Sequence, residues 1–216
     1  MNSAAYARVA AVLGLVGLLG GCVGGLLGGG KPDRLYSFGG ISDVAVSAEV
    51  QPRRLLSMPP VKMPAAAAGD RILTVQGNER AYIKDVRWVS PAAMLMQGAI
   101  EGALRTRVPD MTLADTVTVR KSQAVLSVRL SRFEAEYATD ADSPPKVRIV
   151  GDATLIEAAT RRIIARLPID EREMARGNGS AELAAAFDRA TQRAVVLVAD
   201  AVNQRLPVPA VTTKNE

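Results

Sequence analysis

The chain has 216 residues, a formal net charge of +5, a single cysteine and no histidine. The missing histidines remove the commonest general base and the commonest metal ligand, and one cysteine leaves no partner for a disulfide bond within the chain. Aromatic residues make up 4% of the chain, which leaves few platforms for stacking bases and argues against a nucleic-acid partner. We therefore expect one domain of ordinary size with no metal and no cofactor.

The first 22 residues fall into three regions. Arg8 is the only charge before an apolar run over residues 9–19, and the small residues Gly20 and Gly21 follow. This is the order of regions in a secretory signal peptide. A lone cysteine directly after Leu-Gly-Gly resembles the bacterial lipoprotein signal, in which diacylglycerol alkylates the thiol and the chain is cut before the cysteine. We therefore expect cleavage between Gly21 and Cys22 and lipid attachment at Cys22, which tethers the protein to a membrane without spanning it.

Two other interpretations of this segment stay open. Residues 9–30 carry no charge over 22 positions, which is long enough for an uncleaved transmembrane helix. Nine of those positions are glycine, however, and each interior glycine costs a helix about 1 kcal/mol relative to alanine. A buried structural thiol at Cys22 is the other alternative. The glycines concentrate toward Cys22, where a protease needs a slim, extended substrate, so we favour lipidation.

Composition divides the chain into four parts. Residues 1–21 are the expected signal peptide, and residues 22–34 form a Gly-rich tether with a typical reach on the order of 20 Å. Residues 35–207 form a single α+β domain, and residues 208–216 form a disordered tail.

Alternating apolar residues predict the strands of the first half of the domain. Short strands are expected at residues 35–38, 44–48 and 54–58. A surface loop over residues 63–68 follows. The next feature is a hairpin of residues 71–75 and 80–83, in which Gly77-Asn78 supplies the positive φ angles of a tight turn.

Ser90-Pro91 predicts the start of a helix, because a serine hydroxyl caps the first turn and proline suits the first helical position. The helix is expected over residues 91–107. Its inner face is expected to be Leu95, Ala99, Gly102, Ala103 and Thr106, and to cover its own sheet. Trp88 is expected to be a packing anchor between this helix and the sheet, with an exposed partner contact as the alternative.

The second half is expected to contain long antiparallel strands. Val117 and Val119 alternate as part of a strand, and a longer strand follows over residues 124–137. Its apolar residues stand at even positions from Leu126 to Leu130 and at odd positions from Phe133. This change near Ser131-Arg132 predicts a β-bulge. A second long hairpin is expected from residues 146–156 and 161–167, after an exposed turn at residues 140–142.

A helix over residues 181–206, capped by Ser180, ends the domain. Its apolar stripe is expected to be core: Leu183, Phe187, Ala190, Ala194, Leu197, Val198, Ala201 and Leu206. The fold class is therefore α+β, with a mixed, mainly antiparallel sheet and two main helices packed on it.

No catalytic residue is expected. Glu134 and Glu136 lie on the same side of a strand, as paired catalytic carboxylates do, but Arg129 and Arg132 beside them favour a surface charge cluster. A Ser-Lys pair stays open, so a serine-dependent envelope hydrolase is one alternative. A stand-alone lipoprotein that binds a lipid between sheet and helix is another.

Several features occur in a fixed order: the signal ending at Cys22, the aromatic strand 35–38, Tyr82, and Trp88 just before Pro91 and a helix. An alanine-rich helix then ends the domain. This order resembles the ABC-type transport auxiliary lipoprotein family, which includes the PqiC-like lipoproteins. The hallmark of that family is a tyrosine followed by a tryptophan and a helix begun by proline, which Tyr82, Trp88 and Pro91 match.

The resemblance implies a non-enzymatic role beside an ABC permease and ATPase and a mammalian-cell-entry (MCE) protein of the PqiB or MlaD kind. Such assemblies move lipids or other apolar molecules between two membranes. The resemblance also implies possible self-assembly of the chain into rings. Val23 after the lipidated cysteine is not an aspartate, which favours sorting to the outer membrane, with the inner membrane as the alternative.

Overall fold

The computed structural model describes residues 32–40, 54–138 and 143–208. From Arg34 onward these residues belong to one compact unit. Both residues of the expected cleavage site, the strand expected at 44–48, the turn expected at 140–142 and all of the expected tail except Val208 lie outside the described residues.

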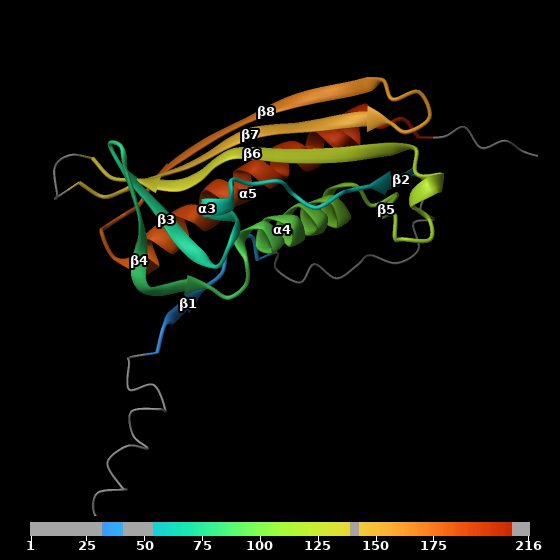
Figure 1. Ribbon diagram of the computed structural model, residues 1–216. Helices are drawn as coiled ribbons and strands as arrows, with labels where there is room; N and C mark the ends of the chain where they lie inside the picture. The colour runs from blue at the N-terminus through green and yellow to red at the C-terminus, as the bar shows by residue number, and fades with distance from the viewer. Residues whose placement is uncertain (1–31, 41–53, 139–142, 209–216) are drawn as a thin grey trace, which may run out of the picture. The chain divides into compact units, whose positions relative to one another are not determined.

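The elements of the described residues follow one another in this order: β1 (Arg34–Tyr36), β2 (Arg54–Ser57), α3 (Ala65–Ala68), β3 (Arg71–Gln76), β4 (Glu79–Trp88), α4 (Ala92–Arg107), β5 (Met111–Leu113), the 3₁₀ helix η1 (Val119–Lys121), β6 (Ala124–Glu136), β7 (Lys146–Glu157), β8 (Ile163–Met174) and α5 (Ser180–Arg205). The strands form one mixed sheet, and the helices lie mainly on one face of it (Figure 1). The predicted α+β class is confirmed.

The long strand β6 holds the sheet together. One edge of β6 pairs with β7 along its whole length, and β7 pairs in turn with β8. Both pairings are antiparallel. The other edge of β6 pairs in parallel with β2 near Ala124 and with β3 near Ala135. The β3–β4 hairpin is antiparallel and turns at Gly77, whose φ is 55°. The predicted hairpin is therefore confirmed.

The predicted bulge in β6 is also confirmed. The register of β6 against β7 shifts between Leu130 and Arg132, so Ser131 is the extra residue. Leu130 faces the core before the bulge, and Phe133 and Ala135 face it afterwards; all three are at most 3% exposed. Without the extra residue, Phe133 would point to the opposite face of the sheet, because side chains alternate along a strand.

Four aromatic rings from four separate segments meet in the core. Trp88 packs edge-on against Phe38 and Phe187, with ring centroids 4.8 Å and 5.2 Å away. Phe133 completes the group, 5.1 Å from Phe38 and 4.9 Å from Phe187. The chain has three phenylalanines and one tryptophan, so this aromatic cluster uses all of them. Trp88 is 2% exposed, so it is a packing residue and not an exposed contact, but its ring neighbours lie on the segment after β1 and on α5 and not on the helix 91–107 that was expected.

The segment after β1 crosses both long helices. Gly39 has a φ of 67°, and a Cβ built on it would overlap the Cβ of Ala99 on α4. Its backbone N–H donates to Asp188 Oδ1 on α5 at 2.7 Å, and Gln192 Nε2 donates to the carbonyl of Gly40 at 3.2 Å. Glycine is required at position 39 by both the close approach and the backbone angle.

Arginine side chains hold helix α5 at two places. In its first half, Arg189 pairs with Glu173 of β8 at 2.7 Å, which lowers the pKa of the Glu173 carboxyl. At its end, the buried Arg54 guanidinium donates to the carbonyls of Asn203 and Leu206 at 3.1 Å and 3.2 Å, and pairs with Asp110. A cation at this position satisfies carbonyls that have no partner within the helix.

Two local predictions are wrong, and one short strand was not predicted. Residues 65–68 were expected to be loop, but the N–H groups of Ala67 and Ala68 donate to the Pro64 carbonyl and close one helical turn. Val117 and Val119 were expected in a strand, but the Asp115 carboxylate accepts from the N–H groups of residues 117 and 118 and bends the chain there. The three-residue strand β5 is too short to have been predicted.

The capping predictions are also wrong, although each predicted helix begins and ends within one residue of the observed position. Pro91 and Gly179 are the N-cap residues, and no side chain caps either helix. The Ser180 hydroxyl forms a hydrogen bond with the Tyr36 hydroxyl at 3.0 Å instead, because β1 lies beside the start of α5.

The buried face of α4 differs from the predicted one. Its buried residues are Ala92, Met96, Ala99, Ile100, Ala103 and Leu104, and its main neighbour is α5. The predicted face was chosen for its small residues. The face that is buried instead contains the larger Met96 and Ile100, because their burial removes more apolar surface from water. In α5, Leu197 was expected in the core but is 43% exposed.

Replacement of Trp88 by alanine is expected to lower the free energy of unfolding by about 3–5 kcal/mol, because it leaves a cavity beside the rings of Phe38 and Phe187. Chemical denaturation of the purified protein measures this change. Val89→Ala is the control, since Val89 is 51% exposed. An equal, small loss in both variants would contradict the structural role of the cluster.

Replacement of Gly39 by alanine is expected to cost about 1–2 kcal/mol from the left-handed backbone alone, and more from the overlap with Ala99. Gly40→Ala is the matched control, because a Cβ at that position has no atom within 4 Å. Thermal unfolding of the two variants should therefore differ in midpoint. Equal midpoints would refute the requirement for glycine at position 39.

Candidate interaction surfaces

The three residues of the family signature do not form one site. Trp88 lies in the aromatic cluster. Tyr82 is half-buried on the same strand; its hydroxyl donates to the carbonyl of Ala66 at 3.0 Å, and the Arg71 guanidinium lies 4.2 Å from its ring centroid. Pro91 is exposed at the start of α4. Tyr82 thus holds α3 against the hairpin, and Pro91 sets the start of α4.

The expected charge cluster on β6 is present in part. Arg132 Nη1 donates to Glu136 at 2.7 Å, and Arg132 Nε lies 3.3 Å from Glu134. Glu134 is only 6% exposed, so it is buried beneath the arginine and is not a surface residue as expected. Arg129 forms no ion pair with the described residues. The two carboxylates are therefore neutralised by cations, which suits a structural ion pair better than acid–base catalysis.

An apolar hollow of about 430 Å³ lies beside α4. Its walls come from the segment after β2 and from the first half of the helix: Met58, Pro60, Val61, Ala93, Met94, Gln97, Gly98 and Glu101. Gln97 Oε1 accepts from the Val61 N–H at 3.0 Å and its Nε2 donates to Glu101 at 2.9 Å, which fixes the segment on the helix. Met94 is 66% exposed at the rim.

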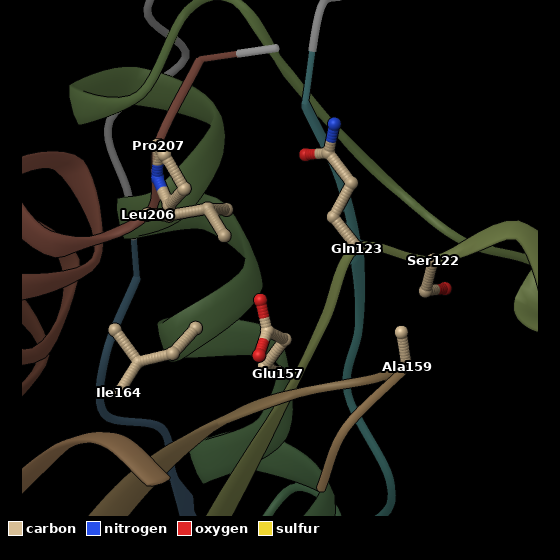
Figure 2. Close-up of a pocket in the computed structure, with 7 residues that line it drawn as sticks. All are labelled: Ser122, Gln123, Glu157, Ala159, Ile164, Leu206 and Pro207. Carbon is tan, nitrogen blue, oxygen red and sulfur yellow. The ribbon is translucent and has the colours of Figure 1, made fainter. Parts of the chain in front are cut away.

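A second hollow, of about 290 Å³, lies at the end of α5. Figure 2 shows the carboxylate of Glu157 between Ile164 and Ala159, with Leu206 and Pro207 across from them. Ile164 reaches this place because it is the extra residue of a register shift between β7 and β8. The Thr160 hydroxyl and Arg162 hold Glu157 and lower the pKa of its carboxyl. A general acid needs the opposite shift.

The described residues contain no group of three or more histidine, cysteine, aspartate or glutamate side chains placed to hold a metal ion. Among the same residues, no helix is both long enough and apolar enough to cross a membrane.

Sequence reasoning missed both hollows. The residues that line the larger one come from two segments about 35 positions apart, and none carries a chemical signal on its own. Met94, which is 66% exposed and lies on the side of α4 opposite to its buried stripe, was the one hint.

The fold is shared with solved structures of low sequence identity. A crystal structure of protein XCC0632 from Xanthomonas campestris matches with a TM-score of 0.67 and 19% identity, over 80% of this chain and 95% of that one. A crystal structure of an uncharacterized protein matches with a TM-score of 0.61 and 16% identity, over 80% and 99% of the two chains. No curated protein sequence matches this chain.

The model of one protein family, described as the ABC-type transport auxiliary lipoprotein component, matches residues 36–199. That range runs from β1 into the last third of α5, and so includes the aromatic cluster and the hollow beside α4. The chain belongs to the ABC-type transport auxiliary lipoprotein family.

Proposed function

We propose that this protein is a non-enzymatic accessory component of an ABC transport system that works with an MCE-type protein to move lipids or other apolar substrates between two membranes. The family match over residues 36–199 carries this proposal. A lipid on Cys22 would anchor the domain, through the tether of residues 22–34, to the outer membrane. Self-assembly of the domain into rings is a further expectation from the family.

The packing supports an accessory role over a stand-alone lipid carrier. A lipid held between sheet and helices would occupy the space that the aromatic cluster fills, where all four rings are at most 3% exposed. The two hollows described above are open recesses at the surface, lined mainly by exposed or half-buried side chains. They suit contact with another protein better than enclosure of a ligand.

We place the contact with the MCE-type partner at the hollow beside α4. Two of its side chains, Met58 and Met94, are flexible thioethers that adapt to different apolar partners. The polar network of Gln97 and Glu101 keeps the backbone on both sides of the hollow fixed. A preformed apolar recess with adaptable walls loses little entropy when a partner side chain enters it.

Affinity purification of the full-length, C-terminally tagged protein from membranes in mild detergent tests the function. We expect mass spectrometry to find an acylated N-terminal peptide beginning at Cys22, together with an MCE-type protein. Cys22→Ser is the control and should release the chain from the membrane fraction. An acylated Cys22 without any transport partner would refute the accessory role and leave the anchor intact.

Met94→Asp tests the contact surface in the same experiment. A carboxylate at the rim would be desolvated by an apolar partner, so we expect the yield of co-purified partner to fall about tenfold or more. Met174→Asp is the matched control, since Met174 is 51% exposed on β8. Equal recovery from both variants, with unchanged unfolding midpoints, would move the contact away from α4.

A further inference from the structure

Four exposed cations lie at the end of the sheet where β6 begins and β7 turns into β8: Arg120, Lys121, Arg161 and Arg166. They come from η1, from the turn after β7 and from β8. The Ala158 N–H donates to the carbonyl of Gln123 at 2.8 Å, which holds the turn beside the segment that follows η1. We call these four residues the basic end.

Exposed aliphatic side chains occur among these cations. Val117 is 82% exposed at the tip of the loop before η1, Val119 is 43% exposed within η1, and Ile163 is 52% exposed at the start of β8. Single exposed apolar side chains are normal on a soluble protein, but several of them gathered among unpaired cations indicate a binding surface.

The acidic groups nearby do not neutralise the basic end. Asp115 accepts from the Thr118 hydroxyl at 2.7 Å and from the N–H groups of residues 117 and 118, so it is committed to shaping its own loop. Glu157 accepts from Thr160 and pairs with Arg162 at 3.5 Å. None of the four cations of the basic end forms an ion pair with another described residue. Their positive charge is therefore uncompensated.

We propose that the basic end binds an anionic phospholipid surface. Cations beside a bilayer are attracted to its anionic head groups, and aliphatic side chains enter the boundary between head groups and acyl chains. An acidic protein would engage the cations but would leave Val117, at a loop tip, with no recess to fill. A bilayer accommodates both kinds of side chain at once.

The position of the basic end gives this contact a direction. The Tyr36 hydroxyl bonds to Ser180, so the strand that follows the tether lies at the start of α5. Leu206 and Pro207, just past the end of α5, line a hollow with Gln123 and Ala159, which lie two residues along the chain from Lys121 and Arg161 of the basic end (Figure 2). A helix of 26 residues separates the two places by about 39 Å. If the proposed anchor at Cys22 holds, the basic end contacts a second membrane.

Vesicle bridging by the full-length lipoprotein tests this inference. The protein is reconstituted into neutral phosphatidylcholine vesicles and then mixed with labelled vesicles of phosphatidylcholine, with or without phosphatidylglycerol. We expect capture of the anionic vesicles only, and loss of capture in high salt, because exposed charges are screened. The variant R120Q/K121Q/R161Q/R166Q should lower the capture about tenfold or more.

The matched control changes the same number of exposed cations near the other end of α5, in the variant R34Q/R80Q/K84Q/R176Q, and should capture anionic vesicles normally. V117S should weaken capture with little change in its salt dependence. Equal losses in the two four-charge variants would reduce the effect to net charge and overturn the proposal. Loss of a co-purifying protein from the basic-end variant, without any vesicle capture by the wild type, would assign the surface to a protein and also overturn it.

Flotation separates this inference from the proposed function. A protein that floats with the neutral vesicles but captures no anionic ones keeps its anchor and loses the second contact. A protein that fails to float with neutral vesicles lacks the anchor, and its direct flotation with anionic vesicles then reports the basic end alone.

Discussion

The contact among Phe38, Trp88, Phe133 and Phe187 is the interaction on which the rest of the structure depends. The four rings come from the segment after β1, the end of β4, the second half of β6 and the first half of α5. The bulge at Ser131 exists to aim Phe133 inward, and a sheet that lacked it would lose one of the four rings from its core.

The cluster also explains how a three-residue strand can join the tether to the domain. Among the described strands β1 pairs with β4 alone, and Leu35 on it is 59% exposed, so its own pairing is weak. Phe38 lies in the core, and Gly39 and Gly40 bond to side chains of α5. The end of the tether is therefore held by the core of the domain. A pull on an anchored N-terminus would be resisted by aromatic packing as well as by a few edge hydrogen bonds.

Sequence reasoning predicted what depends on local periodicity. The two long helices, the hairpins and the bulge in β6 all leave a pattern of apolar residues in the sequence. The helices and the bulge were located correctly, whereas β4 and β8 extend beyond the predicted strands, to Trp88 and Met174. It failed where a tertiary contact decides between similar local choices. Ser180 has the residue type of an N-cap, but Tyr36 takes its hydroxyl. The face of α4 could not be predicted because its partner, α5, lies about 90 residues away in sequence. For the same reason both hollows and the basic end were missed, since their residues meet only in the fold.

The placement of charge shows how the surface is divided. Along the edge of the sheet, β8 carries acidic residues that α5 neutralises: Arg193 pairs with Glu171 and Glu173, each at 2.8 Å. The arginine side chains cover half of this long edge strand and so protect it from pairing with another chain. Pro168 adds to the protection because it has no N–H to donate to a further strand. At the basic end the four cations have no ion-pair partner among the described residues, and Val117, Val119 and Ile163 are exposed among them. The charges along β8 are thus used within the fold, whereas those of the basic end, beside exposed aliphatic side chains, are open to a charged surface outside the chain.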